Sequence, residues 1–117
     1  MQKFTNFTEN TIEANMAILD SELIYLTENG KQVGSLILCF KNEKANVFSV
    51  AVLEKHRGKG FGKKLMENAI LRAKQRGCSV VELNTEVDNV VANSLYEKMG
   101  FELKGLLDDY NNYQLII

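Results

Sequence analysis

Short apolar stretches separated by polar turns fill the first half of the chain. Residues 23–27, 33–40 and 46–53 are rich in aliphatic and aromatic side chains, which favours strands. The turn between the first two stretches holds the Asn29-Gly30 pair, and both residue types tolerate the positive φ of a tight hairpin. The pattern therefore predicts three strands in an antiparallel meander.

A helical repeat follows the meander. A strand over 80–85 comes after the repeat, and a strand–helix–strand unit implies parallel strands joined by a right-handed crossover. Gly77 is placed to end the helix, because glycine adopts the left-handed conformation of a helix C-terminus without strain. Four apolar residues recur at steps of four and predict one buried helix face: Phe61, Leu65, Ala69 and Ala73.

A shorter helix and a terminal strand pair complete the predicted fold. The chain has no proline, internal repeat or low-complexity linker, so we expect residues 1–117 to form a single α+β domain with a mixed sheet. The remaining expected elements are a helix over 90–99 capped by Asp88 or Asn89 and ended by Gly100, strands over 101–107 and 112–117, and a polar turn from Asp108 to Asn111.

Composition is that of an ordinary globular protein. Charged residues make up 25% and the net charge is −1, so neither a nucleic acid nor a membrane surface is an expected partner. The longest unbroken apolar run, Leu36 to Phe40, is too short to cross a bilayer. Cys39 and Cys78 lack metal-ligand spacing and are expected to be small core residues, so we expect no metal site and a reducing, cytoplasmic location.

The segment Arg57-Gly58-Lys59-Gly60-Phe61-Gly62 stands between the third strand and the long helix. Its glycines allow a sharp turn and close approach of a ligand, and a helix N-terminus attracts anions. The spacing matches neither a dinucleotide-binding fingerprint nor a Walker loop, and alone it also fits a turn without a ligand. We interpret it as a cradle for a phosphate or pyrophosphate, because five cations surround it: Lys55, Arg57, Lys59, Lys63 and Lys64.

A second motif, from Asn89 to Phe101, has a Tyr near the end of the short helix and Gly-Phe before a strand. Together the two motifs resemble the GNAT superfamily of N-acetyltransferases, and the resemblance covers about residues 22–117. The first signature of that family, Arg-x-x-Gly-x-Gly, falls on Arg57, Gly60 and Gly62. The second signature, Asn-x-x-Ala-x-x-Leu-Tyr-x-x-x-Gly-Phe, falls on Asn89, Ala92, Leu95, Tyr96, Gly100 and Phe101.

The resemblance implies that the chain binds acetyl-coenzyme A. Backbone amides of the glycine loop would hold the pyrophosphate, and the main chain around Ala51 would pair with the pantetheine arm. Asn89 in this family bonds the pantetheine or fixes the second helix, and a simple helix cap is the compatible alternative. The expected cofactor-binding residues are Ala51, Val52, Arg57, Gly58, Lys59, Gly60, Phe61, Gly62, Lys63 and Asn89.

Tyr96 is the residue that the resemblance places in the chemistry. A thiol has a pKa of about 8.5 and a phenol about 10, so a tyrosine is protonated at neutral pH and can give a proton to a leaving thiolate. Without the motif, Tyr96 would be read as a helix residue packing on the sheet. We interpret three other candidates as structural. His56 is expected at the surface beside the loop, Glu86 as a surface carboxylate rather than a base, and Tyr113 as a packing residue.

The start of the chain departs from the family pattern. Only about 22 residues precede the first hairpin, so the resemblance implies a short member with at least one helix missing or reduced and an altered acceptor wall. Within those residues, a capping-box pattern from Asn10 to Glu13 favours a helix over 11–19, with a strand as the alternative. The expected strand over 46–53 carries no carboxylate where many members place a base.

These features lead to two functional hypotheses. The first is an N-acetyltransferase that moves an acetyl group from acetyl-coenzyme A to a primary amine, on a small molecule or a peptide, by direct attack and without a metal. The second is a non-catalytic acyl-coenzyme A-binding module that acts as a sensor or scaffold. The apolar end Leu115-Ile116-Ile117 also suggests a homodimer.

Overall fold

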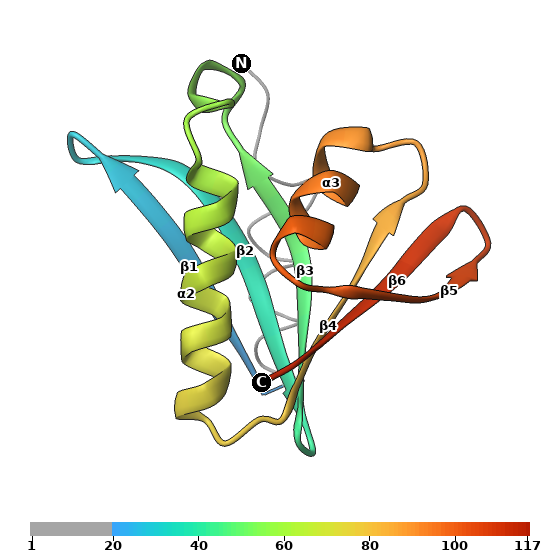
Figure 1. The fold of residues 1–117 in the computed structure, drawn as a ribbon. Coiled ribbons are helices and arrows are strands. Elements are labelled where there is room, and N and C mark those ends of the chain that lie inside the picture. The colour runs from blue at the N-terminus through green and yellow to red at the C-terminus, as the bar shows by residue number, and fades with distance from the viewer. Residues whose placement is uncertain (1–19) are drawn as a thin grey trace.

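The structure, a computed structural model, describes residues 20–117, and the expected helix over 11–19 lies outside them. Within this range no helix is long and apolar enough to span a membrane. The elements follow the predicted order closely (Figure 1): β1 (Ser21–Glu28), β2 (Lys31–Lys41), β3 (Lys44–Val52), the 3₁₀ turn η1 (Glu54–His56), α2 (Phe61–Gln75), β4 (Val80–Glu86), α3 (Val90–Lys98), β5 (Glu102–Leu107) and β6 (Tyr110–Ile116).

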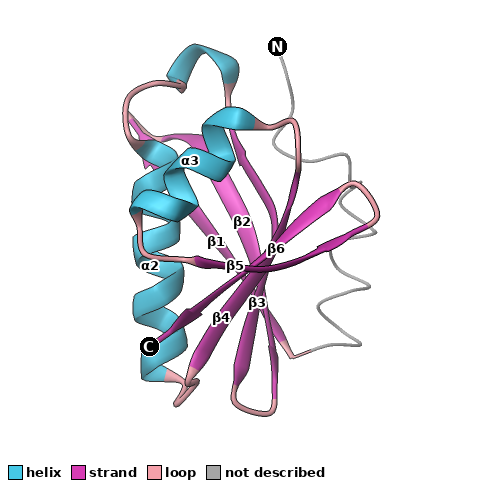
Figure 2. Ribbon diagram, turned by 45° about the vertical axis from the view of Figure 1, so that its right-hand side comes forward, coloured by secondary structure: helices cyan, strands magenta, loops and turns pink. Residues whose placement is uncertain are grey.

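One mixed sheet organises these elements. Its strand order is β1-β2-β3-β4-β6-β5, and β3–β4 is the parallel pair, as the predicted strand–helix–strand unit requires. The other four pairs are antiparallel. Figure 2 shows α2 and α3 on the same face of the sheet. The α+β class and the meander are therefore confirmed.

The apolar stripe of α2 forms the centre of the core. Leu65, Met66, Ala69 and Ala73 are completely buried and join Leu36 and Leu38 of β2 in one cluster. The helix lies close to the sheet at Gly34, because a Cβ there would come within 3.1 Å of Leu65 Cδ1. Burying a side chain the size of leucine stabilises the fold by about 1.5–3 kcal/mol, so this helix face is a major source of stability.

An extra residue interrupts β3 at Ser49. Ile37 of β2 faces Phe48 of β3, yet Ser35 faces Ala51, so two steps along β2 correspond to three along β3. Ser49 adopts φ +55°, in the left-handed region that residues other than glycine seldom occupy. This is a β-bulge, which bends the strand and increases its local twist.

The parallel pairing of β3 with β4 stops just before this bulge. It covers four residue pairs, from Lys44 opposite Val80 to Val47 opposite Leu83. Beyond Val47, β3 pairs with β2 alone among the described strands, while β4 continues beside β6 as far as Glu86. Figure 1 shows the two strands close together at one end and diverging toward the end where α2 begins. The sheet is therefore open between its two halves.

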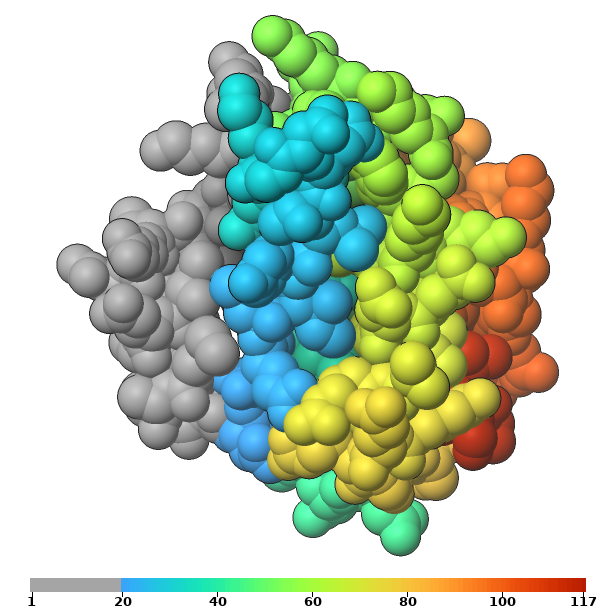
Figure 3. Space-filling model, turned by 90° about the vertical axis from the view of Figure 1, so that its left-hand side faces the viewer, coloured from blue at the N-terminus to red at the C-terminus, as the bar shows by residue number. Residues whose placement is uncertain are grey.

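The far end of α2 is fastened to β1 by ion pairs. Arg72 makes a bidentate pair with Glu22, at 2.6 Å from Nε to Oε1 and 2.7 Å from Nη2 to Oε2. Arg76 contacts Glu22 and Asp20, and its guanidinium stacks 4.0 Å from the centroid of the Phe40 ring. The Arg72 hydrogen bonds hold the pKa of Glu22 below its ordinary value. Figure 3 shows β1 and α2 side by side on this face of the molecule.

Two details differ from expectation. The turn before β6 is shorter than predicted, because Asp108 takes φ +54° and lets two residues reverse the chain, so Tyr110 and Asn111 already belong to the strand. Cys39 and Cys78 are half-buried rather than core residues. Cys39 lies where β2 leaves the core, and Cys78 packs on the cluster only from the loop after α2.

Candidate active site

The start of α2 lies beside the open end of the sheet and is built around glycines. Gly58 and Gly60 have φ +77° and +82°, which other L-residues adopt only with strain. A Cβ built on either would meet no protein atom within 4 Å, so open space surrounds both. Gly60 is the N-cap of α2, and its carbonyl accepts the first helical hydrogen bond from the Lys64 amide at 3.1 Å.

The first turn of α2 is electrostatically unbalanced. Glycine offers no side chain to cap the helix, and no acidic residue occupies the first turn. Lys63 and Lys64 stand there instead, although the partial positive charge of a helix N-terminus favours carboxylates. The amide groups and the lysines together favour an anion at this position.

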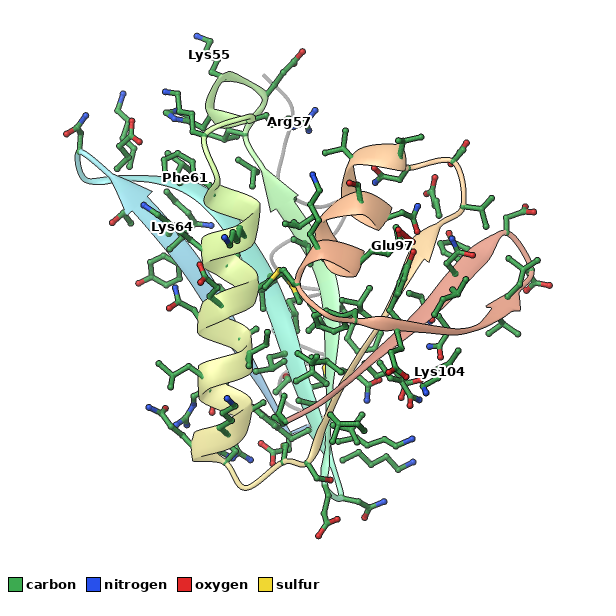
Figure 4. All side chains as sticks on the ribbon, in the orientation of Figure 1. Lys55, Arg57, Phe61, Lys64, Glu97 and Lys104 are labelled. Carbon is green, nitrogen blue, oxygen red and sulfur yellow. The ribbon has the colours of Figure 1, made fainter. Side chains whose placement is uncertain are left out.

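Side-chain cations surround this turn in unequal ways (Figure 4). Arg57 Nε donates to the Val52 carbonyl at 3.1 Å, which holds the guanidinium against the end of β3. Lys64 Nζ lies 5.6 Å from the centroid of the Phe61 ring. Lys55, Lys59 and Lys63 are exposed, and within residues 20–117 none of them forms an ion pair with a carboxylate.

His56 is partly buried and faces two other residues. Its Nδ1 is 3.7 Å from Glu28 Oε1, and its ring lies 6.1 Å from that of Phe61. These contacts tie the loop before α2 to the end of β1. His56 is thus held between neighbouring elements with its side chain 24% exposed, so the expectation of a surface flank is only partly met.

α3 approaches the start of α2 through the second half of its length, at Leu95. Asn89 caps α3, and its side-chain oxygen accepts from the Ala92 amide at 3.2 Å. A Cβ on Gly62 would lie 3.6 Å from Leu95 Cδ2, so the two helices nearly touch there. A shallow pocket of about 400 Å³ with mainly apolar walls lies along this side of α3, lined by Val90, Val91, Ser94, Leu95 and Lys98.

Tyr96 points into the core from α3 and is only 5% exposed. Its ring contacts Phe101 and Tyr113, with centroids 5.9 Å and 6.1 Å away. Burial raises its pKa to about 12. No hydrogen bond found for the described part of the chain involves its hydroxyl. The Tyr96 hydroxyl is therefore protonated throughout the physiological pH range and can serve as a proton donor.

A second shallow pocket of about 420 Å³ lies at the end of β4. Glu86 is exposed there, and Tyr110, its partner in the β4–β6 pairing, is 44% exposed. Tyr113, by contrast, is fully buried, as the packing interpretation predicted. The pocket is lined by Glu86, Val87, Asp88, Asp109 and Tyr110.

Sequence reasoning did not single out Asn93, although it joins α3 to both neighbouring strands. Its side chain contacts the Glu86 and Asn89 carbonyls as well as Asn111 and Tyr113. The one signal in the sequence is a polar residue one turn after the cap at Asn89, on a helix whose other inward residues are apolar or aromatic.

Comparison with known proteins places these features in a family. The sequence model of the acetyltransferase (GNAT) family matches residues 3–101. The chain belongs to the GNAT family. This GNAT chain is 33% identical over 76 residues to the ribosomal protein bS18-alanine N-acetyltransferase of Escherichia coli K12. That alignment covers 65% of this chain and 51% of the relative, so it spans about half of the relative's length.

Solved GNAT structures share the fold. The crystal structure of the Escherichia coli ribosomal-protein-S18-alanine N-acetyltransferase matches with a TM-score of 0.84 and 26% identity, over 95% of this chain and 77% of that one. The PaiA N-acetyltransferase of Thermoplasma acidophilum, crystallised with coenzyme A, matches with a TM-score of 0.81 and 19% identity, over 96% and 81%. The suspected family and fold are therefore confirmed.

Proposed function

We propose that this GNAT protein is an N-acetyltransferase that moves an acetyl group from acetyl-coenzyme A to a primary amine. The observation that carries the proposal is the coincidence of two features at one place. The β3–β4 pairing ends after Val47, which leaves strand edges open, and the adjacent start of α2 favours an anion without supplying one. A long thioester with a pyrophosphate in its middle fits both features.

The glycine loop is proposed to hold the pyrophosphate. The amides of the first turn of α2 point out of the helix, and the open space at Gly58 and Gly60 is where a Cβ would otherwise intrude. Lys59 and Lys63 are exposed at the same turn and add charge. The pantetheine arm would follow the open edge of β3 near Ala51.

Two of the expected cofactor ligands form hydrogen bonds within the protein. The Asn89 side chain caps α3 through the Ala92 amide, so its proposed contribution is to fix the start of that helix. The Arg57 guanidinium bonds the Val52 carbonyl, so its proposed contribution is to hold the end of β3 in place. Both residues would thereby help to shape the cofactor site. Coenzyme A bound to the structural neighbour PaiA supports the choice of cosubstrate.

The proposed chemistry is direct transfer. The amine nitrogen forms a bond to the thioester carbonyl carbon, the carbon–sulfur bond breaks, and the nitrogen loses a proton to solvent. Tyr96 donates its proton to the departing sulfur and regains one from solvent. Its pKa of about 12 keeps the donor protonated in the free protein. A free thiol has a pKa near 8.5, so transfer to a separated thiolate would be uphill, and the proposed role of the hydroxyl is to donate to the sulfur while the carbon–sulfur bond breaks.

The acceptor is proposed to be a small-molecule or peptide amine. The Escherichia coli relative is named for an alanine of a ribosomal protein, which makes a peptide α-amino group a reasonable first probe. Such a group has a pKa of about 7.7–8, so a good fraction is already neutral at physiological pH. The open carboxylate-lined pocket beside β4 would tolerate a cationic acceptor.

Binding and turnover test the proposal separately. Acetyl-coenzyme A binding is measured by calorimetry, and thiol release is followed with an alanine-initiated peptide, a lysine amide and spermidine. Tyr96→Phe should bind acetyl-coenzyme A within about twofold of wild type but release thiol about 100-fold more slowly. Binding without thiol release for any amine would instead favour the sensor or scaffold function.

A further inference from the structure

Asn93 uses its whole hydrogen-bonding capacity to join three elements. Its Nδ2 donates to the Glu86 carbonyl at 2.9 Å and to the Asn89 carbonyl at 2.7 Å. Its Oδ1 accepts from Asn111 Nδ2 at 2.9 Å and from the Tyr113 hydroxyl at 2.8 Å. A carboxamide has two donors and two acceptor positions, so all four are satisfied. Turning the amide over would set its oxygen against two carbonyls, which fixes the orientation.

The Tyr113 hydroxyl lies between two side chains of α3. Asn93 Oδ1 is 2.8 Å away and Glu97 Oε2 is 3.2 Å away, and these residues are one helical turn apart. Figure 4 shows Glu97 between α3 and the C-terminal strands. Burial and the neighbouring Glu97 carboxylate raise the pKa of Tyr113, so it stays a donor. The hydroxyl therefore holds one turn of α3 at a fixed distance from β6.

Tyr96 sits in that same turn and depends on its neighbours for its position. Its ring packs against Tyr113 at 6.1 Å and 59°, and against Phe101 at 5.9 Å and 62°. Within residues 20–117 no hydrogen bond holds the Tyr96 hydroxyl. The direction of that hydroxyl is thus set by ring packing, and one of the two rings is anchored by its own hydrogen bonds.

We propose that Tyr113, anchored by Asn93 and Glu97, is a positioning residue that aims the Tyr96 hydroxyl at the departing sulfur. The proposal rests on the proton-donor role given to Tyr96 in the proposed function. Tyr113 itself touches no reactant: it is 1% exposed and acts through the ring of Tyr96. Proton transfer requires close donor–acceptor geometry, and a displacement of about 1 Å can cost up to about 100-fold in rate.

A double-mutant cycle tests this inference. Tyr113→Phe keeps the ring but removes the single hydroxyl proton that Asn93 Oδ1 and Glu97 Oε2 share, and should lower kcat for thiol release about fivefold, with the acetyl-coenzyme A Kd within about twofold of wild type. In a Tyr96→Phe background the same change should have no further effect, because there is no hydroxyl left to aim. The amine used is whichever of the three probes wild type acetylates fastest.

Asn112→Ala provides the matched control. Asn112 directly precedes Tyr113 in β6 and donates to Glu82 Oε1 at 3.0 Å and to Asn84 Oδ1 at 2.8 Å, both on β4 rather than on α3. Its removal also deletes two hydrogen bonds from the strand, yet it should leave kcat unchanged. Urea unfolding of each variant reports the accompanying loss of stability.

Each outcome has a distinct meaning. An equal fall in kcat from Tyr113→Phe with and without the Tyr96 hydroxyl would reveal a general structural effect and overturn the positioning role. A slow Tyr96→Phe beside a fully active Tyr113→Phe would also overturn it and leave the proposed function intact. Wild-type activity in Tyr96→Phe would instead remove the proton-donor role. If Tyr113→Phe does not fold, the same double-mutant cycle with Tyr96→Phe is measured for Asn93→Ala instead.

Discussion

Replacing Gly60 by alanine separates the folding role of the glycine loop from its proposed binding role. Gly60 has φ +82° at the N-cap of α2, and a left-handed conformation costs an L-residue about 1–2 kcal/mol. An added Cβ would meet no protein atom within 4 Å, so no clash adds to this strain. The free protein should therefore lose about 1–2 kcal/mol, which lowers the Tm by roughly 4–8 °C in a domain of this size.

The same Cβ should have a larger effect on the complex, because the space it enters is where the pyrophosphate is proposed to lie. We expect coenzyme A to bind at least about tenfold more weakly, a difference of about 1.4 kcal/mol. At a concentration 100 times the wild-type Kd, the ligand stabilises wild type by about 2.7 kcal/mol. A tenfold weaker site would gain only about 1.4 kcal/mol, so the thermal shift should fall to roughly half.

Gly77→Ala is the matched control, since Gly77 follows the opposite end of α2 with the same φ of +82° and has equally open surroundings. Both variants should lose similar stability without ligand, as judged by thermal unfolding. Only Gly60→Ala should show the halved coenzyme A shift, and calorimetry should give the weaker Kd directly. Equal shifts in the two variants would show that the loop at the start of α2 does not hold the cofactor.

Three further predictions concern the scaffold. Glu22→Gln removes a carboxylate whose pKa is lowered, chiefly by the Arg72 hydrogen bonds; the stability that it contributes is present above the ordinary carboxyl pKa and disappears as the pH falls through the lowered one. The variant should thus have a lower free energy of unfolding in urea than wild type at about pH 7, and this difference should disappear below about pH 4. A difference that stays constant with pH would contradict the role given to the Glu22 carboxylate. Leu65→Ala should cost about 3–5 kcal/mol in urea unfolding, because Leu65 is completely buried in the central cluster, and a loss below about 1 kcal/mol would mean that the cluster is loosely packed. Asn89→Ala should cost about 1 kcal/mol by removing the cap on the Ala92 amide, whereas an unchanged Tm would show that this cap is not stabilising.

Local signals explain why much of the fold could be predicted. The hairpin at Asn29 and Gly30 forms because both residues take positive φ, which their side chains permit. The extent of α2 follows from its stripe at steps of four and from Gly77. In each case the residues that decide the conformation are neighbours in sequence, so one stretch contains the whole cause.

Other features depend on residues far apart in the chain. Ser49 adopts positive φ inside an apolar run that looks like an uninterrupted strand, and the cause is the register of β3 against β2, which leaves Ser49 without a partner on β2. The Asn93 amide is satisfied by Asn111 and Tyr113, which lie 18 and 20 residues away. Nothing local marks Arg57 as a partner of the Val52 carbonyl. These arrangements become visible only once the strands are placed beside one another.

The extra residue at Ser49 changes which positions of β3 face inward. Ala45 and Val47, before it, belong to the central cluster, and after it the residues that pack on that cluster are Val50 and Val52. Before Ser49 the odd-numbered residues of β3 point inward, and after Ser49 the even-numbered residues do. A chain lacking Ser49 would keep all four of these side chains on their present face, yet the strand could then run straight and continue hydrogen bonding to its parallel neighbour. The additional residue thus contributes nothing to the interior. Its effect is to bend β3 just beyond the last residue that pairs with β4, which keeps the two strands apart toward the start of α2.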